Sequence, residues 1–120
     1  MLKRTIVEDA IVFSEGVQEF FRVEETESDS GIILTMKGMF RSDVVPDIQD
    51  ELAALATVGA KVIVDLAGVQ YLSSAAQHMF LITQQKMDEL GKGLLVLRAL
   101  PEALYQEFEE TGAAELLMIE

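Results

Sequence analysis

Two adjacent hydroxyl side chains, Ser73 and Ser74, are the residues of this sequence best suited to chemistry. They follow a continuous apolar run that begins at Val62, and helical spacing of apolar residues begins directly after them. A helix N-terminus presents free backbone N–H groups and partial positive charge, so a hydroxyl there can cap the helix or carry a phosphate group. Both interpretations stay open at this point: plain helix capping, and a modifiable serine at an exposed edge.

Other arrangements that could support catalysis or cofactor binding are missing. His78, the only histidine, lies four residues after Ser74, so the two side chains share a helix face. A serine nucleophile also needs an oriented base and an oxyanion hole, and the Gly-x-Ser-x-Gly elbow is absent. The sequence has no cysteine and no glycine-rich nucleotide-binding motif. We therefore predict a protein that is not an enzyme and has no metal or cofactor.

Asp65 differs from the other acidic residues because it ends an apolar strand instead of lying on a solvated helix face. The favoured interpretation is a turn or cap residue whose carboxylate accepts local backbone N–H bonds. A catalytic carboxylate is the less favoured alternative.

Composition indicates one globular domain with an acidic surface. The chain has 120 residues and a formal net charge of -12, from 9 basic and 21 acidic residues. This balance argues against binding to nucleic acid or to anionic membranes, because no basic stripe could neutralise phosphates. No apolar run approaches the ~18 residues of a membrane span, and the N-terminus lacks the apolar core of a signal peptide. We expect a cytoplasmic protein whose partner offers a basic or mixed-charge face.

Hydrophobic periodicity predicts the elements that must position the two serines. Residues 19–40 alternate as a hairpin with a polar turn at 26–31. The elements predicted after it are a helix capped by Ser42 or Asp43 and ended by Gly59, a strand at 61–66, a loop with Gly68, a helix at 74–90, a strand at 93–98, a helix from Pro101 to Gly112, and an apolar segment at 116–119. Such strand–helix–strand order implies an α/β fold with a parallel or mixed sheet. Residues 1–18 are compatible with an N-terminal arm or one extra strand.

The inward faces of the two later helices follow from the same spacing. For the helix at 74–90, the residues expected to point inward are Ala76, Met79, Phe80, Thr83, Met87 and Leu90. For the helix after Pro101, they are Leu104, Tyr105 and Phe108.

Residues 62–76 resemble the signature segment of STAS domains, the fold of bacterial anti-sigma factor antagonists. In that family an apolar strand ends in Asp-Leu-Ser-Gly, an aromatic–aliphatic pair follows, and a helix opens with Asp-Ser-Ser/Thr-Gly-Leu. The matching residues here are Asp65, Gly68, Tyr71, Leu72 and Ser74. Weaker similarities extend the resemblance over residues 19–119: the strand end Gly38-Met39-Phe40, the helix after Ser42, the Gly91-Lys92-Gly93 turn, and the helix between Pro101 and Gly112.

The resemblance implies a STAS-like domain over residues 19–120, after an extension at 1–18. Its expected fold is a four- or five-stranded mixed sheet with about three helices packed mainly on one side. The implied function is partner switching in transcription regulation: the unphosphorylated protein binds an anti-sigma factor that is also a serine kinase, and phosphorylation of the first serine ends that binding. Ser74 corresponds to the phosphorylated serine.

The implied partner-binding residues are Asp65, Tyr71, Leu72, Ser73, Ser74, Ala75, Ala76 and Gln77. The helix start differs from the family pattern at four of these positions, where Ser73 replaces Asp, Ala75 the second hydroxyl residue, Ala76 Gly, and Gln77 Leu. Two alternatives stay open. One is a STAS-like accessory subunit of a transport or lipid-handling system, because STAS-like folds also serve transport. The other is a signalling scaffold that works without phosphorylation.

Overall fold

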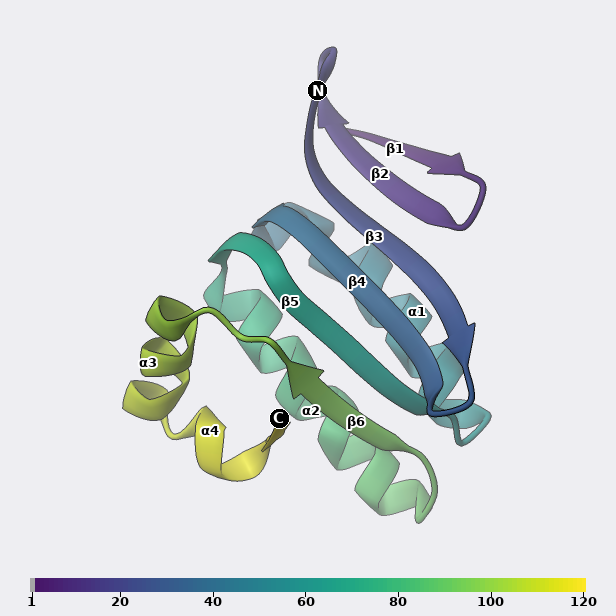
Figure 1. The fold of residues 1–120 in the computed structure, drawn as a ribbon, viewed down its shortest axis with the longest axis vertical. Coiled ribbons are helices and arrows are strands. Elements are labelled where there is room, and N and C mark those ends of the chain that lie inside the picture. Colours follow the sequence, from purple (N-terminus) through teal and green to yellow (C-terminus); the bar gives the residue numbers. More distant parts are fainter. Residues whose placement is uncertain (1) are drawn as a thin grey trace.

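The computed structural model describes residues 2–120. Their strands form one mixed sheet, in which each strand lies beside the strands that precede and follow it in the sequence (Figure 1). The antiparallel strands are β1 (Leu2–Val7), β2 (Ala10–Glu15), β3 (Gln18–Ser28) and β4 (Gly31–Phe40). The strands that continue the sheet parallel to β4 are β5 (Lys61–Leu72), β6 (Leu94–Arg98) and β7 (Met118–Ile119).

The helices connect the parallel strands and pack mainly on one face of the sheet. They are the 3-10 helix η1 (Ser42–Val44), α1 (Val45–Thr57), α2 (Ser74–Leu90), α3 (Glu102–Thr111) and α4 (Ala113–Leu116). Figure 1 shows α1 and α2 behind the sheet, with α3 and α4 beside β6. A parallel pair needs such a crossover connection, because its strands run in the same direction.

The predicted α/β class with a mixed sheet is confirmed, and within residues 2–120 the sheet has seven strands in place of the expected four or five. The additional strands are the N-terminal hairpin β1–β2 and the short β7. Residues 2–15, for which an arm or a single strand had been expected, therefore form two strands. Phe13 of β2 is fully buried and packs against Phe21 of β3, with ring centroids 6.0 Å apart. This apolar contact joins the hairpin to the rest of the sheet.

Strand β5 is longer than the strand predicted at 61–66, and the expected loop around Gly68 is wrong. Two register shifts against β4 accommodate the extra length: Asp65 pairs with Thr35 but Gly68 pairs with Lys37, and a second shift precedes Tyr71. Such bulges let a strand continue while one residue remains unpaired. An added Cβ at Gly68 would lie 2.9 Å from Cγ of Lys37, so a larger residue there would displace that exposed side chain.

The predicted capping of the first helix by Ser42 or Asp43 is also wrong. A 3-10 turn precedes α1, and Val44 occupies the N-cap position without a side-chain hydrogen bond. The Asp43 carboxylate instead accepts hydrogen bonds from Arg41. Pro46 does lie in the first turn of α1, as predicted, where its missing N–H costs nothing.

Helix α2 and strand β6 closely match their predicted ranges. The expected inward residues of α2 are buried except Leu90, which is 44% exposed because it is the last helical residue. In α3, Leu104 and Phe108 are buried, but Tyr105 is 39% exposed. Leu104 and Phe108 lie one turn apart and define the inward line, and Tyr105 falls to one side of it.

Replacing Gly38 with alanine is expected to destabilise the fold strongly. Gly38 has φ +101°, and an added Cβ would lie 2.1 Å from the Phe20 carbonyl oxygen. We expect Gly38→Ala to lower the free energy of unfolding by about 3 kcal/mol or more, measured by urea denaturation. The control is Gly16→Ala, at φ +61° with open space around it, which should cost only about 1 kcal/mol. Equal losses would show that the close approach at Gly38 is unimportant.

Replacing Phe13 with alanine tests whether the hairpin and the remaining sheet unfold together. The Phe13 ring is fully buried, so its loss should cost about 3–5 kcal/mol. We infer a single cooperative transition, which far-UV circular dichroism and tyrosine fluorescence should follow at the same urea midpoint. A loss below about 1 kcal/mol, well under the usual range for such a substitution, would mean that the hairpin contributes little to the stability of the rest.

Candidate functional site

The candidate site lies where the carboxyl ends of two parallel strands meet. Phe40, the last residue of β4, is paired with Leu72, the last residue of β5. The Ser73 N–H donates a 3.0 Å hydrogen bond to the Phe40 carbonyl oxygen. Arg41 and Ser73 are therefore the first residues after the paired strand ends. In α/β proteins, this edge is where binding sites are usually built.

Ser73 and Ser74 have different environments, which separates the two interpretations of the pair. Ser73 is the N-cap of α2: its side chain is 5% exposed, and its Oγ accepts a 3.2 Å hydrogen bond from the Ala76 N–H. Ser74 is the first residue of the helix, and it is exposed. Capping thus belongs to Ser73, and the Ser74 hydroxyl faces solvent at the positive end of the helix dipole.

The residues that follow Ser74 divide between core and surface. Ala76 is fully buried, so the methyl group that replaces the family glycine fills space in the core. Ala75 is exposed, and Gln77 is half-buried. The Gln77 Nε2 donates a 3.3 Å hydrogen bond to Oε2 of Glu107 in α3. Gln77 thereby links the first turn of α2 to the neighbouring helix.

The two residues that precede the serines also point in opposite directions. Leu72 is 3% exposed and belongs to the core, whereas Tyr71 is 46% exposed. Tyr71 is paired with Met39 of β4, which is 37% exposed. Of the eight predicted partner-binding residues, Tyr71, Ser74, Ala75 and Gln77 therefore present side chains at this end of the molecule, and Leu72, Ser73 and Ala76 support them from within.

Asp65 lies away from this surface. Its Oδ1 accepts a 3.0 Å hydrogen bond from the Ala67 N–H, so the predicted local bond is present. The predicted turn or cap position is wrong, because Asp65 lies within β5 and is paired on both sides. Its Oδ2 accepts a 3.2 Å hydrogen bond from Nε of Arg98 in β6, an ion pair that the sequence did not reveal. Asp65 is seven strand residues before Leu72, the end of β5, which at about 3.3 Å per residue is roughly 20 Å. The structure therefore assigns Asp65 to the pairing of β5 with β6 and does not bring it to the serines.

Sequence reasoning missed an ionic cluster at the carboxyl end of β4, built around Arg41. Arg41 Nη2 lies 2.8 Å from Oε1 of Glu15, and the same guanidinium bonds the Asp43 carboxylate. Hydrogen bonds from Arg41 hold the pKa of the Asp43 carboxyl below its ordinary value. The guanidinium also stacks over the Phe20 ring, 3.9 Å from its centroid. Glu15 and Arg41 are 26 residues apart, so no local pattern pointed to this contact.

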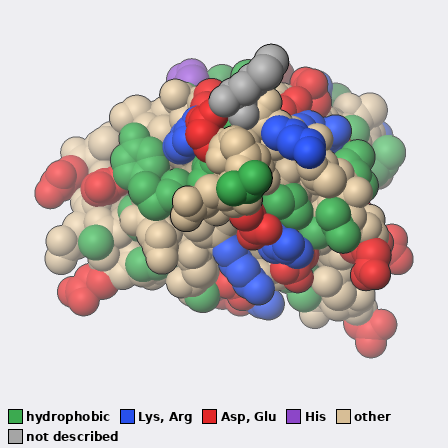
Figure 2. Space-filling view, turned by 90° about the horizontal axis from the view of Figure 1, so that it is seen from above, with side chains coloured by type: hydrophobic (Ala, Val, Ile, Leu, Met, Phe, Trp, Pro, Cys, Tyr) green, Lys and Arg blue, Asp and Glu red, His purple; other side chains and the backbone are tan. Residues whose placement is uncertain are grey.

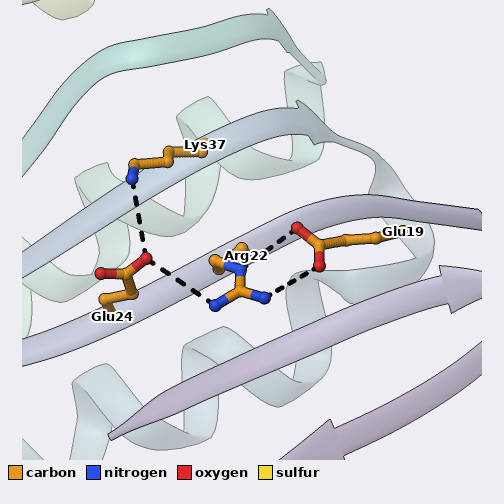
Figure 3. A network of polar contacts seen from close by, with 4 residues as sticks. All are labelled: Glu19, Arg22, Glu24 and Lys37. Atoms are coloured by element: carbon orange, nitrogen blue, oxygen red, sulfur yellow. Dashed lines mark hydrogen bonds and ion pairs between the residues drawn. The ribbon is translucent and has the colours of Figure 1, made fainter. Parts of the chain in front are cut away.

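A second network makes the sheet face opposite the helices polar (Figure 3). Arg22 bonds Glu19 at 3.0 Å and lies 3.9 Å from Glu24, which in turn lies 3.6 Å from Lys37. Exposed pairs of this kind contribute about 0–1 kcal/mol each to stability. Figure 2, which views the molecule from above, shows basic, acidic and hydrophobic side chains interspersed, with no large surface of one sign.

A shallow hollow of about 160 Å³ adjoins Ser74, lined by Gln77, His78, Leu81, Thr111 and Ala113. His78 is exposed one helical turn from Ser74, but no hydrogen bond joins the two side chains in the structure of residues 2–120. None of the helices between residues 2 and 120 is long and apolar enough to span a membrane.

Known structures with a similar fold include anti-sigma factor antagonists. Unphosphorylated SpoIIAA matches with a TM-score of 0.68 and 12% identity, over 82% of this chain and 87% of its own. Phosphorylated SpoIIAA of Bacillus matches with a TM-score of 0.63 and 14% identity, over 83% of this chain and 90% of its own. An anti-sigma factor antagonist from Mycobacterium paratuberculosis matches with a TM-score of 0.68 and 16% identity, over 82% of this chain and 84% of its own. At these identities the likeness establishes the fold.

Comparison with curated protein sequences gave no match. The sequence does match a family model described as "Mlab, STAS domain" over residues 23–119. That range includes β4 to β7, the helices between them and most of β3, and it leaves the N-terminal hairpin outside. With its sequence match and its fold in agreement, this chain belongs to the STAS domain family.

Proposed function

We propose that this protein is a non-catalytic, cytoplasmic interaction module that acts like an anti-sigma factor antagonist. Its partner would be an anti-sigma factor or serine kinase-like protein, bound at the N-terminal end of α2. The observation that carries the proposal is the division of roles between the serines. Because the buried Ser73 caps the helix, Ser74 is left exposed among the surface residues Tyr71, Ala75 and Gln77.

Ser74 is suited to a phosphate that acts as a switch. A phosphoryl group adds up to about two negative charges, which the free N–H groups and dipole of the α2 N-terminus would stabilise. The nearby Arg41 already bonds Asp43, so the helix end would be the main stabilising element. The same charge would face a docked partner and oppose binding. Both the unphosphorylated and the phosphorylated SpoIIAA structures share this fold, which supports the view that the fold accommodates the modification.

The four departures from the family pattern favour a second candidate at the same surface. Ser73 supplies the cap that an aspartate would supply, but without its charge, and the first turn of α2 has no acidic residue. This favours a scaffold that works without phosphorylation, or an accessory subunit of a transport or lipid-handling system. Neighbouring genes for a kinase and a sigma factor would favour the phosphorylation switch at Ser74. Neighbouring transporter genes, an ATPase partner or a co-purifying apolar ligand would favour the accessory subunit of a transport or lipid-handling system.

Alanine substitutions at the two serines should change the free energy of unfolding by different amounts. Ser73→Ala removes the hydrogen bond to the Ala76 N–H and should lower the free energy of unfolding by about 1 kcal/mol. Ser74→Ala removes an exposed hydroxyl and should change it by less than about 0.5 kcal/mol. Urea denaturation of both variants measures the difference. The reverse order would show that Ser74, and not Ser73, is the structural residue.

Mimicking the phosphate at Ser74 should weaken partner binding. A pull-down from the native host, followed by calorimetry with the purified partner, compares the wild type with Ser74→Asp and Ser74→Ala. We expect Ser74→Asp to weaken binding at least about tenfold, or 1.4 kcal/mol, and Ser74→Ala to bind normally. The matched control is Ser30→Asp, an exposed serine in the β3–β4 turn, which should bind like the wild type.

Incubation with ATP and the partner kinase, followed by mass spectrometry, should place phosphate on Ser74. If Ser74→Asp binds as tightly as the wild type and Ser74 gains no phosphate, the switch is excluded. Binding that is nevertheless lost on substituting Tyr71 or Gln77 would then identify the phosphorylation-independent module.

A further inference from the structure

The N-terminal hairpin extends the sheet beyond its helical layer. Figure 1 shows α1 and α2 behind the central strands and neither of them behind β1. The helix-side face of the hairpin is therefore only partly covered. Ile6 of β1, which is paired with Ile11 of β2, is 64% exposed. This face is a local addition to the domain, because the family match begins only at residue 23.

Beneath the hairpin lies a hollow of about 240 Å³, which we call the hairpin groove. Its apolar lining comes from the hairpin, the two next strands and α1: Ile6, Ile11, Val23, Leu34 and Ile48. An apolar cavity of about 150 Å³ is large enough to hold benzene. The hairpin groove can therefore accept one large aliphatic or aromatic side chain.

Acidic side chains surround this apolar floor. The lining includes Glu8, Asp9, Glu25 and Glu51, with Arg4 as its one basic residue. Within residues 2–120, none of the four carboxylates takes part in an ion pair. Their negative charge, which Arg4 offsets only in part, attracts cationic groups and repels nucleic acid, anionic membranes and the same rim of a second copy. The rim therefore selects a basic protein segment.

Backbone contacts fix the turn that carries part of the acidic rim. The hairpin turn at Glu8 and Asp9 is tied to β3, because the Glu25 N–H donates a 3.0 Å hydrogen bond to the Asp9 carbonyl oxygen. Glu8 has φ +54°, a left-handed conformation that non-glycine residues rarely adopt. A rim that is already in place reduces the entropy lost on binding.

From this combination, we propose that the hairpin groove binds a segment of a partner protein that presents a large apolar side chain flanked by Lys or Arg. The apolar side chain would occupy the floor, and the cations would meet the acidic rim. This site is separate from the proposed switch, because none of the groove residues belongs to the surface around Ser74. The two proposals can therefore fail independently.

The test uses the full chain, isotope-labelled for NMR, and two synthetic amphipathic peptides of about 15 residues, the length at which an isolated helix becomes marginally stable. One contains only Leu and Lys, and the other only Leu and Glu. We expect the Leu/Lys peptide to shift the amide signals of the residues that line the groove, and the Leu/Glu peptide to leave these signals unchanged. Fluorescence anisotropy of labelled peptide gives the affinity.

Two substitutions on separate elements should each weaken Leu/Lys binding at least about tenfold, equivalent to 1.4 kcal/mol. Ile6→Glu places a charge at the groove mouth, and Glu51→Lys reverses one rim charge on α1. Their matched controls are Val58→Glu, at an exposed apolar residue, and Asp29→Lys, at an exposed acid in the β3–β4 turn. Both controls should bind like the wild type. Circular dichroism verifies that every variant is folded.

Three outcomes would overturn the proposal. Unchanged affinity in Ile6→Glu and Glu51→Lys would place the peptide elsewhere. Equal losses in Asp29→Lys would show diffuse attraction to an acidic protein and no groove site. A concentration-dependent dimer that Ile6→Glu abolishes, detected by sedimentation, would show that a second copy of the chain occupies the groove.

Discussion

Four phenylalanine rings in successive contact hold this domain together. Phe13 of the hairpin meets Phe21 of β3 at 6.0 Å between centroids, Phe21 meets Phe40 of β4 at 4.6 Å, and Phe40 meets Phe80 of α2 at 6.2 Å. All four are among the fully buried side chains. The row therefore links the added hairpin, the ends of the central strands and the helix that carries the serines, and each ring contributes both buried area and ring–ring contact.

The position of Ser74 follows from this packing. Phe40 ends β4, and its carbonyl oxygen accepts the hydrogen bond from the Ser73 N–H, so the start of α2 is joined to the sheet. Ala76 and Phe80 are buried, so the side of α2 that carries them packs in the core. Ser74 is consequently held outward by its neighbours, and it needs no interaction of its own to remain exposed. The exposed position of Ser74 thus depends on buried atoms around it.

Prediction from the sequence succeeded where the signal was local. The helix at 74–90 and the strand at 93–98 were close to their observed bounds because apolar periodicity and Gly91 mark them within a few residues. The role of Asp65 in a local N–H bond was likewise confirmed. Errors arose where a neighbouring strand determined the outcome. Strand β5 runs on past Gly68 because β4 pairs with it through two bulges, and Asp43 bonds Arg41 instead of capping α1.

The sequence by itself determined the α/β class and the order of most elements, because capping and hydrophobic spacing act over a few residues. The resemblance of residues 62–76 to the STAS signature then marked Ser74 as the residue to examine. Only the tertiary structure decided which serine is buried, how the N-terminal hairpin joins the sheet, and that Glu15 meets Arg41 across 26 residues and Asp65 meets Arg98 across 33. The hairpin groove belongs to this second group. Its walls come from four strands and one helix, and only strand register and core packing bring such distant residues together.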